Sequence, residues 1–169
     1  DHYMAIVECA DWEASMLPYD SSFSKKKALG EKTRKDIPLL LASIEEELGL
    51  VPTSRFLLGY SLGGLFALWA AFHGLFDGFA SVSGSLWYPL MKEWVEQAEA
   101  PRLLKRAYFS IGDLERGKPS SPFCQVREKT EEIVSICQNK GLSTCFELNE
   151  GNHFSKPAFR LAKASLHLL

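Results

Sequence analysis

The sequence has no apolar run approaching the roughly 20 residues that a helix needs to cross a bilayer, and its first residues do not resemble a secretory signal. An excess of one charge is also missing, because 19 Lys and Arg residues face 21 Asp and Glu residues and leave a net charge of −2. Such a balance gives no general attraction for nucleic acid or for anionic lipid. We therefore expect a soluble protein with neither a nucleic-acid partner nor a membrane partner.

The C-x-x-C spacing of redox and zinc motifs is absent. The four cysteines are Cys9, Cys124, Cys137 and Cys145. Three of them fall in apolar or amphipathic runs, where a thiol behaves as a small core residue. This usage favours reduced cysteines in a cytoplasmic protein, with a Cys137–Cys145 bridge across a helix-to-strand turn as the alternative.

Internal repeats and low-complexity segments are absent as well. With 169 residues and 46% hydrophobic content, the chain is long enough for one domain, over residues 1–169, around a single core. An initiator methionine is missing, and the chain opens almost directly into an apolar run, which is typical of a piece of a longer protein. An N-terminally incomplete domain is thus the alternative to a complete one.

What is present is a regular alternation of strand-like and helix-like segments. Apolar β-type runs occupy residues 3–9, 55–60, 78–83, 107–111 and 143–148, and helical patterns occupy 36–48, 62–73, 90–98, 123–140 and 157–168. We expect the first of these helices to begin at Asp36 and end at Gly49, and Ser155 to cap the last. The alternation predicts an α/β fold with a mostly parallel sheet covered on both faces, in which ligands bind beyond the carboxyl ends of the strands.

The segment 59–64, Gly-Tyr-Ser-Leu-Gly-Gly, joins a predicted strand to a predicted helix. A G-x-S-x-G sequence in this context is typical of the nucleophile elbow, and the alternative is an ordinary glycine-rich turn. Such a turn strains the serine backbone, and we expect glycine at positions 59 and 63 to remove collisions. The turn would lift the Ser61 hydroxyl clear of the sheet and direct the N–H of Leu62 toward an oxyanion.

A serine hydroxyl needs a base to remove its proton, and a carboxylate to orient that base. His153 is the only one of four histidines that follows a predicted strand in the chain order serine, acid, histidine. The alternative is a loop histidine with local hydrogen bonds only. Asp113 and Glu115 both follow the strand at 107–111, and we favour Glu115 because its longer side chain suits this position.

Four ordered motifs carry a resemblance to a known family. They are Gly59 to Gly64, Ser83-Gly84-Ser85-Leu86-Trp87, Gly112-Asp113-Leu114-Glu115 and Gly151-Asn152-His153-Phe154. In this order they resemble the esterase family of α/β hydrolases that includes enterochelin esterases and esterase D-like proteins, over nearly the whole chain. Asp11-Trp12 and Leu17-Pro18 resemble a loop of its small bacterial members. The resemblance implies an α/β-hydrolase fold with Ser61 as nucleophile, Glu115 as acid and His153 as base.

The chain departs from the family at its beginning. Family members carry a further strand and a loop upstream of the segment at 3–11, and that loop commonly supplies a second oxyanion N–H. We therefore expect a sheet that lacks some N-terminal strands. Trp12, Trp87 and Tyr88 are expected either to wall the substrate pocket or to fill the edge of the core.

These observations predict a serine carboxylic-ester hydrolase that works through an acyl-enzyme on a small-molecule ester. No metal and no organic cofactor is implied. Transfer of the acyl group to an acceptor other than water would make the protein an acyltransferase. A catalytically silent ligand-binding protein on the same fold is the second alternative.

Overall fold

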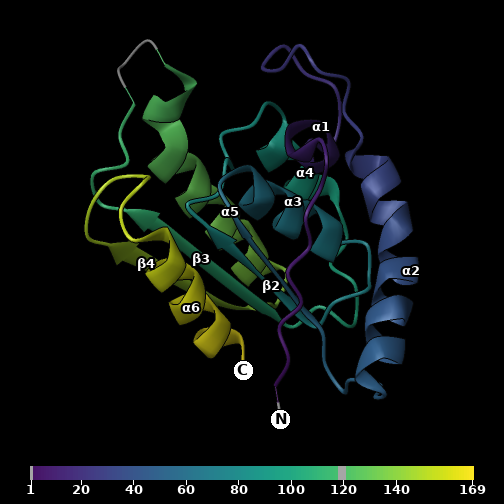
Figure 1. Ribbon diagram of the computed structural model, residues 1–169. Coiled ribbons are helices and arrows are strands. Elements are labelled where there is room, and N and C mark those ends of the chain that lie inside the picture. The colour runs from purple at the N-terminus through teal and green to yellow at the C-terminus, as the bar shows by residue number, and fades with distance from the viewer. Residues whose placement is uncertain (1, 118–120) are drawn as a thin grey trace.

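The computed structural model describes residues 2–117 and 121–169, and its centre is a four-stranded parallel sheet with the strand order β1-β2-β3-β4 (Figure 1). The strands are β1 (Phe56–Tyr60), β2 (Gly78–Val82), β3 (Arg106–Gly112) and β4 (Ser143–Asn149). Register is continuous across the sheet, with Leu58 beside Ala80 and Ala80 beside Tyr108. The predicted α/β class with a parallel sheet is confirmed.

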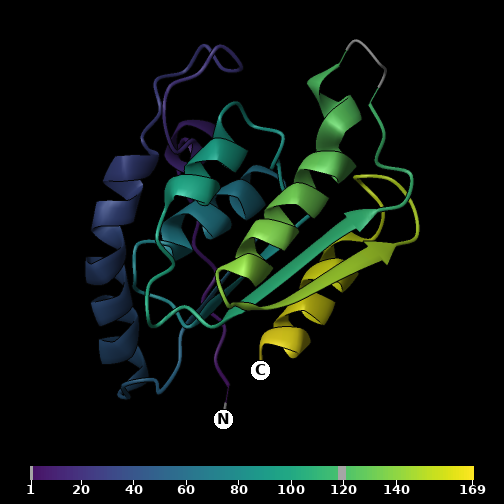
Figure 2. The same ribbon diagram turned by 180° about the vertical axis from the view of Figure 1, so that it is seen from behind.

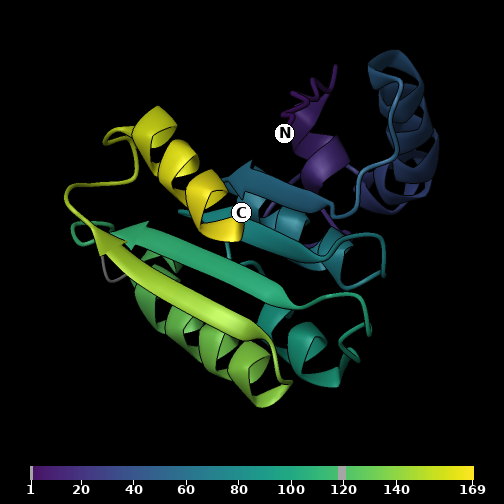
Figure 3. The same cartoon turned by 90° about the horizontal axis from the view of Figure 1, so that it is seen from below.

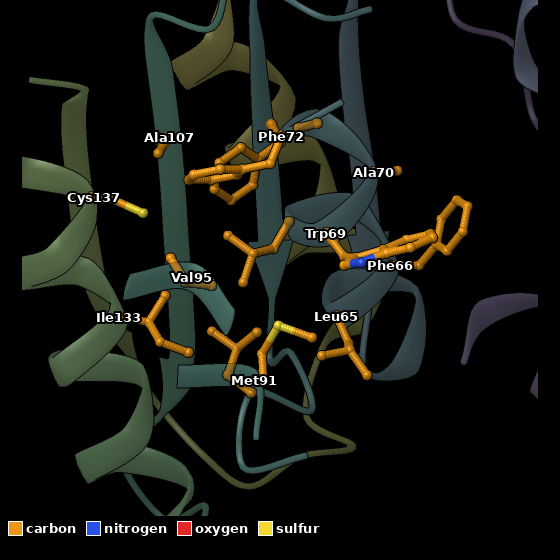
Figure 4. Packing of buried hydrophobic residues seen from close by; sticks show 14 of the residues in the cluster. Leu65, Phe66, Trp69, Ala70, Phe72, Met91, Val95, Ala107, Ile133 and Cys137 are labelled. Atoms are coloured by element: carbon orange, nitrogen blue, oxygen red, sulfur yellow. The ribbon is translucent and has the colours of Figure 1, made fainter. Parts of the chain in front are cut away.

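Helices cover both faces of this sheet, because its side chains alternate between two apolar layers. The helices α3 (Leu62–Ala71), α4 (Met91–Gln97) and α5 (Val126–Asn139) pack on one face, and α6 (Pro157–Leu168) packs on the other (Figures 2 and 3). Phe79 and Phe109 belong to the first layer, while Val82 and Tyr108 belong to the second. Figure 4 shows the larger layer, where α3, α4 and α5 interlock through Leu65, Met91 and Ile133.

The helix predicted from Asp36 begins earlier, at Gly30, and runs as α2 (Gly30–Leu48) through Pro38. The apolar pattern misses its first two turns because they are solvated and carry charge pairs such as Arg34–Glu31. Gly30 itself packs closely, since a Cβ there would lie 2.3 Å from the Leu17 carbonyl oxygen. The predicted end is correct, with Gly49 in the left-handed conformation at a φ of 64°.

The buried strand predicted over residues 3–9 is wrong. The segment has no strand pairing and is largely exposed, with Ile6 at 85%. A β-strand exists only through its ladder of hydrogen bonds to a neighbour, and the described sheet ends at β1. The short helix α1 (Trp12–Met16) follows, and the Asp11 carboxylate caps it by accepting from the Ala14 N–H at 3.2 Å.

Other boundaries shift at helix ends. The last helix begins at Pro157 as predicted, but Lys156 stands at its N-cap position at a φ of 51°, and the Lys156 side chain makes no capping hydrogen bond. The Ser155 hydroxyl, expected to cap this helix, instead accepts from the Asn152 N–H at 3.0 Å. The pattern predicted from residue 123 divides into a 3₁₀ turn (Pro122–Gln125) and α5.

All four cysteines are free thiols, so the alternative of a Cys137–Cys145 bridge is not realised. Cys137 lies fully buried in the larger apolar layer, and this burial raises the pKa of its thiol to about 12. In residues 2–117 and 121–169, no helix has both the length and the hydrophobicity needed to cross a bilayer.

Candidate active site

Ser61 stands at the sharp turn between β1 and α3 with a φ of 56° and a ψ of −119°. A positive φ is rare for a residue with a side chain and stores backbone strain. Gly59 permits this turn, because a Cβ at that position would lie 2.0 Å from the Gly63 carbonyl oxygen. A Cβ at Gly63 would meet only the Met16 sulfur at 4.0 Å, so the collision expected at Gly63 does not exist. The second tight position is Gly64, whose Cβ would lie 3.0 Å from the Ser81 hydroxyl.

The structure brings the Ser61, His153 and Glu115 side chains into one chain of hydrogen bonds. His153 Nε2 lies 3.0 Å from Ser61 Oγ, and His153 Nδ1 lies 2.9 Å from Glu115 Oε2. An ionised carboxylate only accepts hydrogen bonds, so Nδ1 carries a proton, and in the neutral imidazole Nε2 then accepts from the Ser61 hydroxyl. This is the tautomer that a general base next to a serine requires.

The carboxylate of Glu115 is buried and saturated with donors. Its Oε1 accepts from the Ser83 hydroxyl at 2.6 Å, from the Gly112 N–H at 2.6 Å and from Arg160 Nη1 at 3.0 Å. Burial raises the pKa of Glu115, but the hydrogen bonds from His153, Ser83 and Gly112 outweigh that effect and hold the pKa below its ordinary value. Glu115 is therefore ionised at neutral pH.

The other carboxylate of this loop, Asp113, does not reach the imidazole. Its Oδ1 accepts from the Gly151 N–H at 2.8 Å and so holds the backbone of the loop that carries His153. Gly151 adopts a φ of 101°, which a residue with a side chain rarely takes. The same loop is held at a second point, where the Tyr60 hydroxyl donates a hydrogen bond to the His153 carbonyl oxygen.

Three of these residues were not singled out as site residues from the sequence: Tyr60, Ser83 and Arg160. Arg160 had a detectable signal, because it occupies the face of α6 that also buries Ala164 and Leu168. A charged side chain at a core-facing helical position indicates a buried partner. For Tyr60 and Ser83 the sequence carried no signal beyond their places in the quoted motifs.

The aromatic residues expected at the pocket occupy different environments. Trp12 is 61% exposed on α1, whereas Tyr88 is only 2% exposed and donates its hydroxyl to the Tyr19 carbonyl oxygen at 2.6 Å. Tyr88 thus fills the core rather than walling a pocket. Trp87 packs edge-on between Phe23 and Phe123, with ring centroids 4.6 and 4.7 Å away.

No three His, Cys, Asp or Glu side chains gather as metal ligands would in the part of the chain that the structure describes. Ser61 lines neither of two surface hollows. One is lined by Asn149, Lys156 and Arg160, and the other lies between α2 and the loop before β2.

Comparison with known proteins gives one curated relative. YbbA of Bacillus subtilis, an uncharacterized protein, is 29% identical over 130 residues, which cover 73% of this chain and 50% of YbbA. The chain therefore spans half the length of that relative. No protein-family model matches the sequence.

Solved structures give a consistent set of neighbours. The enterobactin esterase Fes of Shigella flexneri superposes with a TM-score of 0.64 at 20% identity, over 80% of this chain and 38% of Fes. An IroE-like serine hydrolase of Shewanella oneidensis superposes with a TM-score of 0.63 at 21% identity, over 84% of this chain and 48% of the hydrolase chain. A ferulic acid esterase superposes with a TM-score of 0.60 at 16% identity, over 79% of this chain and 58% of the esterase chain. The chain has the α/β-hydrolase fold that these proteins share.

Proposed function

We propose that this chain carries the active site of a serine hydrolase that cleaves carboxylic esters through an acyl-enzyme. The observation that carries the proposal is the unbroken relay from Ser61 Oγ to His153 Nε2 at 3.0 Å and from His153 Nδ1 to Glu115 Oε2 at 2.9 Å. A relay of this geometry activates a hydroxyl that is otherwise a weak nucleophile. The α/β-hydrolase fold of the esterases described above supports it.

In the acylation step, Ser61 Oγ attacks the ester carbonyl carbon while its proton passes to His153 Nε2. Glu115 stays ionised and stabilises the imidazolium that forms. When the tetrahedral intermediate collapses, the bond to the alkoxy oxygen breaks, and Nε2 returns the proton to the departing alcohol. Water then repeats the cycle on the acyl-enzyme and releases the carboxylic acid.

Negative charge develops on the carbonyl oxygen during both attacks. The N–H of Leu62 is well suited to hold it, because Leu62 is the first residue of α3 and the first N–H groups of a helix have no partner within the helix. The N-terminal end of the helix dipole adds partial positive charge at the same place. One such donor contributes roughly 3 kcal/mol to transition-state stabilisation in other acyl-transfer enzymes.

The substrate that we propose is a small-molecule carboxylic ester. The printed names of the neighbours, an enterobactin esterase and a ferulic acid esterase, describe ester cleavage by those proteins. No metal or organic cofactor takes part in the proposed steps, since the nucleophile, base and acid are all side chains of this chain.

Hydrolysis of a short-chain p-nitrophenyl ester tests the proposal. We expect p-nitrophenol release by the unmodified chain, a loss of roughly 10⁴-fold or more in kcat for Ser61→Ala, and no change for Ser135→Ala, which removes an exposed hydroxyl from α5. A fluorophosphonate should label the unmodified chain and Ser135→Ala but not Ser61→Ala. Equal, nonzero hydrolysis and labelling of all three would remove Ser61 from the mechanism and overturn the proposal. Absence of both hydrolysis and labelling in the unmodified chain would favour a silent binding protein.

A further inference from the structure

Arg160 is buried at the centre of the site without a role in the proposed reaction steps. It projects from α6, its side chain is 1% exposed, and the Glu115 side chain that it contacts is 3% exposed. Burying two charges costs several kcal/mol per ion unless nearly every polar atom is paired. The pairing of the guanidinium therefore indicates what this arginine does.

The two terminal nitrogens of Arg160 bind two different parts of the site. Nη1 donates to Glu115 Oε1 at 3.0 Å and to the Ser83 hydroxyl at 2.9 Å. Nη2 donates to the backbone carbonyl oxygens of Glu150 at 3.2 Å and Asn152 at 3.1 Å. One rigid planar group thus links the carboxylate to the loop that carries the imidazole.

This link controls the contact that the reaction needs. Oε1 of Glu115 is occupied by three donors, so Oε2 alone faces His153 Nδ1. The position of Nδ1 follows the loop backbone, which Arg160 holds at the residue immediately before His153. Because the guanidinium does not flex, it sets the separation between the acid and the base-bearing loop.

We infer that Arg160 is a positioning residue, which holds Glu115 and the His153 loop in register so that His153 can accept the Ser61 proton. The expected effect of Arg160 on kcat rests on the proposed function. The placement of Glu115 and the His153 loop by Arg160 rests on the hydrogen bonds alone. Lysine would keep the charge, but its single nitrogen does not reproduce the two-sided fork. A purely structural arginine would instead stabilise the fold without acting through Glu115.

Kinetics on matched variants separate these roles. We expect Arg160→Gln to lower kcat about 10- to 100-fold, since small misplacements of catalytic groups have effects of this size, with KM changed less than about twofold. Arg160→Lys should recover part of the loss. Lys163→Gln is the control, because Lys163 lies on the same helix and pairs at 2.7 Å with Glu147, outside the relay; we expect its kcat to be unchanged.

Coupling to the acid is the decisive kinetic result. If Arg160 acts through Glu115, adding Arg160→Gln to Glu115→Gln should lower kcat by less than about twofold further. Losses that multiply in the double variant, or an unchanged kcat in Arg160→Gln, would overturn the inference. If Arg160→Gln does not fold, as judged by circular dichroism, Arg160→Lys alone and combined with Glu115→Gln provides the same comparison.

Proton NMR tests the positioning even if no ester is hydrolysed. The His153 Nδ1 proton, bonded to a buried carboxylate, should resonate far downfield of the amide protons in the unmodified chain and in Lys163→Gln. We expect that signal to move or disappear in Arg160→Gln. If the Nδ1 proton signal persists in Arg160→Gln at an unchanged chemical shift, the inference is overturned. Equal hydrolysis by the unmodified chain and Ser61→Ala would instead contradict the proposed function.

Discussion

The Tyr60 hydroxyl donates a hydrogen bond to the backbone carbonyl oxygen of His153, which joins the last residue of β1 to the loop after β4. Tyr60 immediately precedes Ser61, so the contact connects the nucleophile turn directly to the base-bearing loop. The two rings also lie close, with centroids 5.5 Å apart. Tyr60 and Arg160 thus both hold backbone carbonyl oxygens of this loop, at His153 and at Glu150 and Asn152 respectively.

Removing this contact should weaken the proposed activity without abolishing it. A neutral hydrogen bond contributes about 0.5–1.5 kcal/mol, so we expect Tyr60→Phe to lower kcat for a p-nitrophenyl ester by about 2- to 10-fold. Tyr3→Phe is the matched control, because Tyr3 is 58% exposed in the N-terminal segment. A kcat equal to that of the control would show that the loop does not depend on Tyr60.

The two carboxylates after β3 should differ sharply in their effect on turnover. Replacing the acid of a Ser-His-acid relay by its amide lowers kcat about 10⁴-fold in a well-studied protease, because the wrong imidazole tautomer is stabilised. We expect a loss of that order for Glu115→Gln. Asp113→Asn leaves the contact between Glu115 and His153 in place. It should lower kcat less than about tenfold, because it only weakens the hydrogen bond that Asp113 accepts from the Gly151 N–H. The reverse ranking would transfer the role of the acid to Asp113.

The two flanking glycines of the elbow should respond differently to the same substitution. A methyl group at Gly59 would lie 2.0 Å from a backbone oxygen, so we expect Gly59→Ala to lower the free energy of unfolding by about 3 kcal/mol or more. Gly63→Ala meets only a sulfur at 4.0 Å and adds helix propensity, so the free energy of unfolding should rise or stay within about 1 kcal/mol. Urea denaturation of both variants measures this. Similar losses at the two positions would contradict the described turn.

The depressed pKa of Glu115 predicts how stability depends on pH. Its pKa is lower in the folded chain than in the unfolded one, so the ionised carboxylate stabilises the fold fully above the unfolded value of about 4.3. That contribution is lost as pH falls through the lower folded pKa. We expect the difference in unfolding free energy between the unmodified chain and Glu115→Gln to be largest near neutral pH and to shrink below about pH 4.

Glu128→Gln is the control for this titration, because Glu128 is an exposed carboxylate on α5. Urea unfolding of both variants and the unmodified chain at several pH values between about 3 and 7 makes the comparison. A stability difference for Glu115→Gln that stays constant over the whole range would mean that Glu115 has the same pKa in both states.

Much of the fold follows from local patterns along the chain. The run before Ser61 and the Ala/Leu-rich run after it predicted β1 and α3, and the alternation of such runs predicted the parallel sheet, which the structure confirms. The order of the motifs also indicated which side chains would meet beyond the strand ends. The assignment of catalytic roles to Ser61, His153 and Glu115 stays a prediction, which the experiments above test.

The failures lie where a residue's state depends on distant parts of the chain. Residues 3–9 have the composition of a strand but no neighbour in the described sheet to pair with. The first turns of α2 carry charged residues instead of an apolar stripe, so the spacing of hydrophobic residues does not predict them as helix. For Tyr88 the sequence left open whether the ring walls a pocket or fills the core, and only its packing in the core next to Tyr19 shows that it is the second.

The sequence by itself determined the elbow at Ser61, the alternation of elements and the region in which the base and the acid occur, because turn chemistry and hydrophobic periodicity are properties of consecutive residues. Only the tertiary structure decided that Glu115 rather than Asp113 contacts the imidazole, and that Arg160 and Tyr60 hold the loop of His153. Those contacts join residues from separate elements, and their geometry is set by how α6 and the strand-end loops dock on the sheet.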